Sequence, residues 1–337
     1  MGHSRTPFPT LLVCAVLLAT LGGATPLDAQ ATPRKAVFIL LDGIPADVIE
    51  TTPTPAIDAI AAAGGYARAY VGGELGGPTE TPTISAPGYM SLITGTWANK
   101  HNVRGNYGLR PNYDYWNVFR IVETVDASKR TAVFSTWTDN RTILVGEGQP
   151  GAGDFRIDHA ADGFEKDSIA FPPSLGQLRI AAIDDRVATE AAAFIHNEGP
   201  DLSWVYLQYT DDVGHASGQG EAFSTAVSRA DDLVGRIWAA VQHRQSLGED
   251  WMIVVTTDHG RDAETGKGHG GNSARERTTW IATNHAALTQ RYTTQTPGIV
   301  DIAPSILQHL GIVLPAAVAA QMEGVSFLAP ATPGRQP

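Results

Sequence analysis

The chain has 337 residues, of which 43% are hydrophobic and 18% charged, and its formal net charge is −11. This composition supports a large buried core and excludes a wholly disordered or fibrous protein. The acidic balance also argues against a protein that coats nucleic acid, because such a protein needs a basic surface.

The first predicted element is an export signal over residues 1–31. Arg5 precedes an uncharged apolar run over residues 11–24, and the small residues of LDAQA follow, a pattern typical of a cleaved secretory signal. The apolar run is shorter than the ~20 residues that span a bilayer, so we expect no stable membrane span and an exported, periplasmic or secreted protein. Cys14, the only cysteine, would leave with the signal. Any metal must then be held by His, Asp and Glu.

The remaining chain, residues 32–337, alternates predicted strands and helices and is expected to form a single domain. Apolar, β-branched runs predict buried strands at residues 35–41, 131–136, 202–209, 252–257 and 278–283, and amphipathic runs predict helices at 55–64, 184–199 and 221–245. This alternation predicts an α/β fold with a mostly parallel central sheet and helices on both faces. Residues 138–178, rich in Gly, Asp and Pro, are expected to form an irregular excursion.

Residues 83–95, TISAPGYMSLITG, predict a short helix that begins near Ser85. A serine before a proline and an apolar run is typical of a helix N-terminus, where its hydroxyl caps the backbone. The same hydroxyl is also a candidate nucleophile. The pattern of this stretch alone favours capping.

Acidic residues follow three of the predicted strands. Asp42 follows the first strand, Asp211 the third and Asp258 the fourth. One such residue is compatible with a turn or a helix cap. Because the carboxyl ends of parallel strands meet at one edge of a sheet, however, these three are expected to face a common crevice.

Histidines accompany these carboxylates. His215 comes four residues after Asp211, so both side chains can reach one ion from a helical turn. His259 follows Asp258 directly, and His269 lies in the glycine-rich run GKGHGGN. Carboxylates and imidazoles without thiolates suit Zn²⁺, with Mn²⁺ or iron as substitutes. Repulsion among the carboxylates is a further reason to expect a cation.

Five motifs, taken in their order along the chain, resemble those of the alkaline phosphatase superfamily and, within it, of the nucleotide pyrophosphatase/phosphodiesterase branch. They are D-G at Asp42, S-x-P at Ser85, D-x-x-x-H at Asp211, D-H-G at Asp258 and the glycine-flanked His269. The run SLITGTWANKHNVRGN resembles that branch's helix and loop, which ends in an asparagine that binds a phosphoryl oxygen, here Asn106. Residues 300–312 and 323–328 resemble its closing helix and strand. The resemblance spans residues 35–328.

The resemblance implies two zinc sites in an alkaline-phosphatase-like metallohydrolase domain. One site would consist of Asp211, His215 and His269 and the other of Asp42, Asp258 and His259, with Ser85 as nucleophile beside the second. The implied activity is hydrolysis of a small-molecule phosphate ester, at a phosphodiester or pyrophosphate bond, through a phosphoseryl intermediate.

Departures from the family pattern concern the substrate. The branch typically has T-F-P-N where this chain has Ser85-Ala86-Pro87-Gly88, which predicts a more open pocket and puts nucleotide specificity in question. Gly88, Tyr89, Trp137 and Lys267 are the candidate substrate-binding residues. His101, at a family-like position, is expected to have a structural hydrogen-bonding role.

Three alternatives remain. A phosphomonoesterase of the same fold would need extra positive charge, for which Lys267, Arg104 and Arg275 are candidates. A sulfatase is disfavoured, because Tyr89 stands where the sulfatase motif C/S-x-P-x-R has arginine. A protein that binds metal or a phosphorylated glycan without turnover would be free to lose part of the ligand set, which is present here in full.

Overall fold

The computed structural model describes residues 1–4 and 32–330, and the fold below concerns residues 32–330. Most of the predicted export signal, residues 5–31, lies outside the described part of the chain. Within that part, no helix combines the length and the apolar character needed to cross a membrane.

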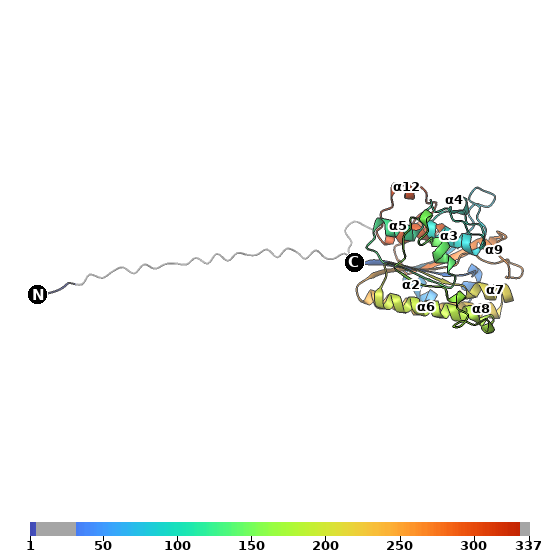
Figure 1. Ribbon diagram of the computed structural model, residues 1–337, viewed down its shortest axis with the longest axis horizontal. Helices are drawn as coiled ribbons and strands as arrows, with labels where there is room; N and C mark the ends of the chain where they lie inside the picture. The colour runs from blue at the N-terminus through green and yellow to red at the C-terminus, as the bar shows by residue number, and fades with distance from the viewer. Residues whose placement is uncertain (5–31, 331–337) are drawn as a thin grey trace. The chain divides into compact units, whose positions relative to one another are not determined.

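A seven-stranded sheet forms the centre of the domain, in the order β2-β7-β6-β1-β5-β3-β4 (Figure 1). The strands are β1 Arg34–Leu41, β2 Gly65–Tyr70, β3 Thr131–Ser135, β4 His159–Ala161, β5 Leu202–Leu207, β6 Asp250–Thr256 and β7 Thr278–Thr283. Among these described strands, β7 alone runs in the opposite direction to the others, so the predicted mostly parallel sheet is confirmed. The sequence pattern predicted all of them except β2 and β4.

Helices cover both faces of this sheet, as predicted (Figure 1). The longer ones are α2 Pro55–Ala63, α3 Ser85–Thr94, α5 Val118–Val125, α6 Leu178–Glu198, α7 Tyr209–Ser217, α8 Glu221–Ser246 and α11 Ile302–His309. Single-turn helices are α1 Ala46–Ile49, α4 Ala98–His101, α9 Ala274–Arg277, α10 Gln290–Thr293 and α12 Ala316–Ala319. Helices α2, α6 and α8 pack on one face, and α3, α5 and α11 on the other.

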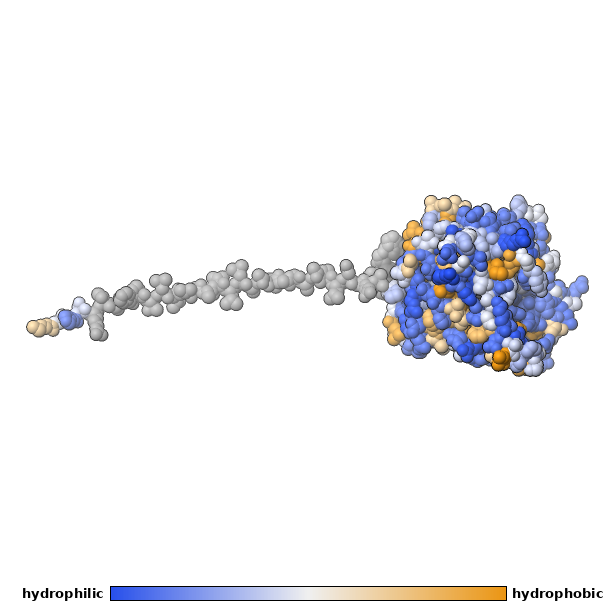
Figure 2. Space-filling view, viewed as in Figure 1, coloured by the Kyte–Doolittle hydropathy of each residue, from blue (hydrophilic) through white to orange (hydrophobic). Residues whose placement is uncertain are grey.

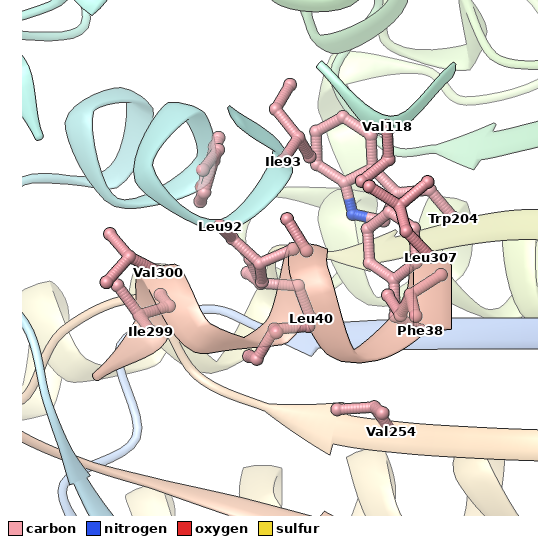
Figure 3. Close-up of a cluster of buried hydrophobic side chains, with 14 of the residues drawn as sticks. Phe38, Leu40, Leu92, Ile93, Val118, Trp204, Val254, Ile299, Val300 and Leu307 are labelled. Carbon is pink, nitrogen blue, oxygen red and sulfur yellow. The ribbon is translucent and has the colours of Figure 1, made fainter. Parts of the chain in front are cut away.

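Strand β1 contributes to the hydrophobic core on both faces of the sheet. Its side chains alternate, because successive strand residues point to opposite faces. Val37 and Ile39 pack against the layer that contains α6 and α8, whereas Phe38 and Leu40 pack against the layer that contains α3 and α11. Figure 3 shows side chains of α3 and α11 above β1 in the second layer. This packing fixes the position of α3 relative to β1.

The face in Figure 2 is mostly hydrophilic, with apolar residues in small separate patches.

The excursion over residues 138–178 contains short elements. They are the π-helical turn Asn140–Val145, the 3-10 turns Pro150–Ala152, Phe164–Lys166 and Pro173–Leu175, and edge strand β4.

The expected closing strand at residues 323–328 does not form. Of its residues, Leu328 makes only an isolated bridge, to Leu288. The backbone N–H groups of Val325 and Phe327 instead donate to the side chains of Asp301 and Ser305, at 2.8 and 2.9 Å. These side chains take the place of a neighbouring strand, so the expectation of a strand was wrong.

Candidate active site

The three acidic strand ends lie side by side, because β1 is flanked by β5 and β6. Asp42 directly follows β1, Asp211 lies in the first turn of α7 after β5, and Asp258 lies in the loop after β6. The backbone N–H of Asp42 still donates to Leu207 O at 3.1 Å. The expected common edge is therefore present and carries all three carboxylates.

Asp42, Asp258 and His259 form the more buried of two clusters of metal-ligand type. One potential ligand atom from each lies within 4.8 Å of the others, and all three residues are buried. Nε2 of His259 is 3.4 Å from Asp42 Oδ1 and 3.3 Å from Asp258 Oδ2. Neither of these buried oxygens has a hydrogen-bond partner among the described residues. A divalent cation would satisfy both, so this donor set fits a metal ion.

The pKa shifts in this cluster also fit a site for a metal ion. Burial and the neighbouring charge of Asp42 raise the pKa of Asp258 well above its usual range. Burial by itself lowers the pKa of His259, but the charges of Asp258 and Asp42 outweigh burial and raise that pKa to about 9. Without an ion, the cluster therefore retains protons that offset excess negative charge.

Asp211, His215 and His269 form the second cluster. Their potential ligand atoms also lie within 4.8 Å of one another. Nε2 of His215 is 3.2 Å from Asp211 Oδ2 and 3.1 Å from Nε2 of His269. Burial and the charge of His259 lower the pKa of His269 to about 4, so its imidazole is neutral near pH 7. The structure therefore brings together the six residues expected to hold metal, in the two groups that the resemblance implies.

Hydrogen bonds fix the ring orientation of two of these histidines. Nδ1 of His269 lies 3.0 Å from Thr83 O, and Nδ1 of His259 lies 2.8 Å from Gly260 O. Because a carbonyl oxygen only accepts, each Nδ1 carries the proton. Each Nε2 then faces its carboxylate neighbours, the arrangement that metal-binding histidines commonly use.

Ser85 lies at the start of α3 but does not cap it. Ile84 is the N-cap residue, and the described hydrogen-bond contacts of the Ser85 hydroxyl are with His259 and Asn106, so the capping interpretation of the hydroxyl was wrong. Oγ of Ser85 instead lies 3.4 Å from Nε2 of His259, and the residue is only 5% exposed. The hydroxyl is therefore directed toward the Asp42 cluster.

Asn106 lies next to Ser85. Its Oδ1 accepts a hydrogen bond from the backbone N–H of Ala86 at 2.9 Å, which directs the amide group. The Nδ2 atom then lies 3.5 Å from Ser85 Oγ. An amide donor is thus held beside the hydroxyl, where it can reach an oxygen of a group attached to Oγ.

A cavity of about 210 Å³ opens above these groups. It is lined by Asp42, Ser85, Asn106, Gln208, Asp211 and the aromatic residues Tyr89, Tyr107, Trp137 and Tyr206. Of the four candidate substrate-binding residues, Tyr89 and Trp137 line it.

The structure does not place Gly88 or Lys267 at this cavity. Gly88 packs against Asp258, and a Cβ added to it would lie 2.9 Å from Asp258 Cβ. Lys267 is exposed, and its backbone carbonyl accepts a hydrogen bond from Arg261 at 3.2 Å. A position near a motif in sequence does not determine the direction of a side chain.

Two tyrosines position Asp42. The hydroxyls of Tyr89 and Tyr206 both donate to Asp42 Oδ2 and lie 2.7 Å from each other. Burial, with the charge of Asp42, raises both phenol pKa values well above 10, so both groups remain donors. Tyr89 is only 1% exposed, and its hydroxyl group holds a carboxylate.

Tyr206, Tyr107 and Gln208 were missed from the sequence. Tyr206 lies inside the apolar run of β5, which has no marker of a polar role. Tyr107 directly follows Asn106, and this position in the sequence could have suggested a role near the site. In the structure it lines the cavity and is 97% exposed. Gln208, which directly follows β5, also lines the cavity.

Comparisons with known proteins identify the family of this chain. The family described as type I phosphodiesterase / nucleotide pyrophosphatase matches residues 36–310. The human ectonucleotide pyrophosphatase/phosphodiesterase family member 7 is 24% identical over 272 residues, 76% of this chain and 54% of that protein. The chain therefore spans about half the length of this relative.

Two solved structures share the fold. Murine ectonucleotide pyrophosphatase/phosphodiesterase 5 matches with a TM-score of 0.59 and 14% identity, over 84% of this chain and 96% of that one. A 2-O GAG sulfatase matches with a TM-score of 0.62 and 15% identity, over 87% and 73%. Because the family match covers most of this chain, the chain belongs to the type I phosphodiesterase/nucleotide pyrophosphatase family, within the alkaline phosphatase superfamily.

Proposed function

We propose that this protein is an exported, two-zinc hydrolase that cleaves phosphodiester or pyrophosphate bonds of small molecules, with Ser85 as nucleophile. The observation that carries the proposal is the position of Ser85 Oγ, 3.4 Å from His259 Nε2. The same nitrogen lies 3.4 and 3.3 Å from two buried carboxylate oxygens that have no hydrogen-bond partner among the described residues. A serine so placed shares one cavity with both candidate metal clusters. Export is proposed from the sequence pattern of residues 1–31.

The two clusters would hold the two ions, Asp42, Asp258 and His259 one of them and Asp211, His215 and His269 the other. When bound, such ions activate a hydroxyl near neutral pH and neutralise the charge that develops on the leaving oxygen. Nitrogen and carboxylate donors favour Zn²⁺, and Mn²⁺ or iron are acceptable substitutes.

The residues of the chain bind and orient the phosphoryl group. In the first step, Ser85 Oγ gives up its proton and bonds to phosphorus as the bond to the leaving oxygen breaks, and the leaving group departs with a proton. Asn106 Nδ2 is placed to donate to a non-bridging oxygen, and the N-terminus of α3 favours the same negative charge. Water then forms a bond to phosphorus, the bond to Oγ breaks, and the Ser85 hydroxyl is restored.

The walls of the cavity favour a diester over a monoester. A monoester carries an additional negative charge, yet none of the described residues that line the cavity is Lys or Arg. Of the three candidate cations, Arg275 binds Asp47 at 3.1 Å, and Lys267 and Arg104 do not line the cavity. Tyr107 and Trp137 offer aromatic surface for an apolar or planar leaving group.

The test is a comparison of kcat/KM on a phosphodiester, a phosphomonoester, a nucleotide and a sulfate ester at matched metal content. We expect the diester to be the best substrate and Ser85→Ala to abolish its turnover with both ions retained. Ser203→Ala is the matched control, because the Ser203 hydroxyl is buried and has no hydrogen-bond partner among the described residues.

The other outcomes separate the alternatives. A higher kcat/KM on the monoester would contradict the diester preference and favour the phosphomonoesterase. A higher value on the sulfate ester would favour a sulfatase. Bound metal without turnover of any ester would identify a binding protein.

A further inference from the structure

Arg261 is a buried cation that the proposed reaction does not use. It follows the D-H-G motif, and its side chain is 1% exposed. Its guanidinium contacts Asp211 Oδ1, and the same nitrogen donates to the backbone oxygen of Asp211 at 2.9 Å. A buried charge is costly unless it is paired, and this one is paired with a residue of the second metal cluster.

The same guanidinium is hydrogen-bonded to the segments that follow three strands, β1, β5 and β6. Besides its contacts with Asp211, Nε of Arg261 donates to Gly43 O at 3.0 Å, and Nη1 donates to Lys267 O at 3.2 Å. Gly43 follows Asp42 in the chain, and Lys267 precedes His269 by two residues. One side chain thus connects the segments that carry ligands from both clusters.

Two glycines provide the space for this guanidinium. A Cβ on Gly214, next to His215, would lie 2.1 Å from Arg261 Cζ. A Cβ on Gly43, whose φ is +67°, would lie 2.8 Å from Arg261 Nη2. On the far side, the ring of Phe223 lies with its centroid 5.6 Å from Cζ. The pocket around Arg261 therefore depends on residues from α7, from α8 and from the turn that follows β1.

We propose that Arg261 is a positioning residue for the second metal cluster: it holds Oδ1 of Asp211, which lies 3.8 Å from His269 Nε2, so that Oδ2 faces His215. Oδ1 contacts the guanidinium, whereas Oδ2 lies 3.2 Å from His215 Nε2. Asp211 would then bind an ion through one oxygen. The proposal rests on the proposed two-ion site.

Charge and position predict opposite effects on metal binding when Arg261 is removed. Loss of a nearby positive charge would by itself strengthen binding of a cation. Loss of an orienting partner weakens metal binding by about 10- to 100-fold. If Arg261 acts by positioning Asp211, its removal weakens metal binding, although the loss of a positive charge would by itself strengthen it.

The test is competition with a chelator for zinc on the intact protein, with affinities measured for both ions. For Arg261→Met, we expect one ion to bind about 10- to 100-fold more weakly and the other to be retained. Arg291→Met is the control, because it also removes a partly buried Arg–Asp pair, here with Asp301 at 2.7 Å.

A second variant displaces the guanidinium without changing any charge. In Gly214→Ala, the new Cβ in helix α7 would overlap the Arg261 guanidinium. Alanine is otherwise favourable in a helix, so the substitution has no other expected cost. It should weaken the same ion as Arg261→Met. Gly235→Ala, where the nearest atom to a new Cβ is Ala56 Cβ at 3.3 Å, is the matched control.

The outcomes are distinguishable. Selective weakening of one ion in both variants supports the proposal. Unchanged or tighter binding of both ions in Arg261→Met overturns it and leaves the proposed function intact. Equal weakening of both ions also overturns it, because that is the result of a general structural defect. A wild-type protein that binds no metal would contradict both the proposed function and this inference.

Discussion

His101 provides a test of the packing beneath the candidate nucleophile. The side chain is fully buried, and its Nδ1 accepts from the backbone N–H of Val103 at 3.1 Å. The proton is therefore on Nε2, which donates to Ser91 Oγ at 3.1 Å. Ser91 in turn donates to Pro87 O, in the first turn of α3, at 2.8 Å. The expected structural role of His101 is confirmed, and it requires a neutral imidazole.

The magnitude follows from the pKa of His101, which burial and, to a smaller extent, Arg104 lower from 6.5 to about 3. Because the unfolded chain takes up the proton first, stability from this group is complete above pH 6.5 and is lost as the pH falls toward 3. One pH unit corresponds to about 1.4 kcal/mol. Between pH 8 and 4.5, His101 should therefore cost the fold roughly 3 kcal/mol.

The assay is urea unfolding of the wild type and of His101→Gln at both pH values, in a chelator so that metal release does not contribute. Glutamine does not titrate, so other groups cancel in the difference between the two proteins. We expect the stability advantage of the wild type to shrink by roughly 3 kcal/mol at the lower pH. An advantage that stays constant with pH would refute the inference that His101 is buried and neutral.

Three further predictions concern the candidate site. Asp258→Asn removes a carboxyl group that burial and Asp42 make costly to ionise, while its oxygen can still accept from Gly43, so the chelated variant should melt at a higher temperature than the chelated wild type. A lower melting temperature would contradict the raised pKa of Asp258. Tyr206→Phe removes a donor to Asp42 and should weaken zinc binding about 10-fold in chelator competition, whereas unchanged affinity would count against this role. Asn106→Ala should lower kcat about 10²- to 10³-fold in steady-state assays at unchanged metal content, and a smaller loss than 10-fold would exclude a direct role in charge stabilisation.

Most of the sheet could be predicted because its central strands carry a local signal. The run at residues 35–41 and the runs of β5 and β6 are mainly apolar and almost entirely buried, as expected of strands covered on both faces. Strand β2, GYARAY, was not predicted because it is partly exposed at the sheet edge and contains glycine, alanine and arginine. Its pairing with β7 is a tertiary contact that no local pattern records.

The candidate ligands could be predicted for a similar reason. Asp42, Asp211 and Asp258 occupy strand ends, and parallel topology alone brings such residues to one edge. Tyr206 and Arg261 were missed because each acts through a carboxylate that is distant in sequence, at separations of 164 and 50 residues. The direction of the Ser85 hydroxyl likewise depends on the loop that carries His259.

The central claim, that Ser85 is the nucleophile of a two-ion phosphoester hydrolase, is tested most directly by mass spectrometry of protein quenched during turnover. With a phosphodiester substrate, we expect the peptide that contains Ser85 to gain the phosphoryl half of the substrate. We expect neither this adduct nor turnover in Ser85→Ala that has full metal content. A Ser85→Ala protein that hydrolyses the diester at the wild-type rate would contradict the account.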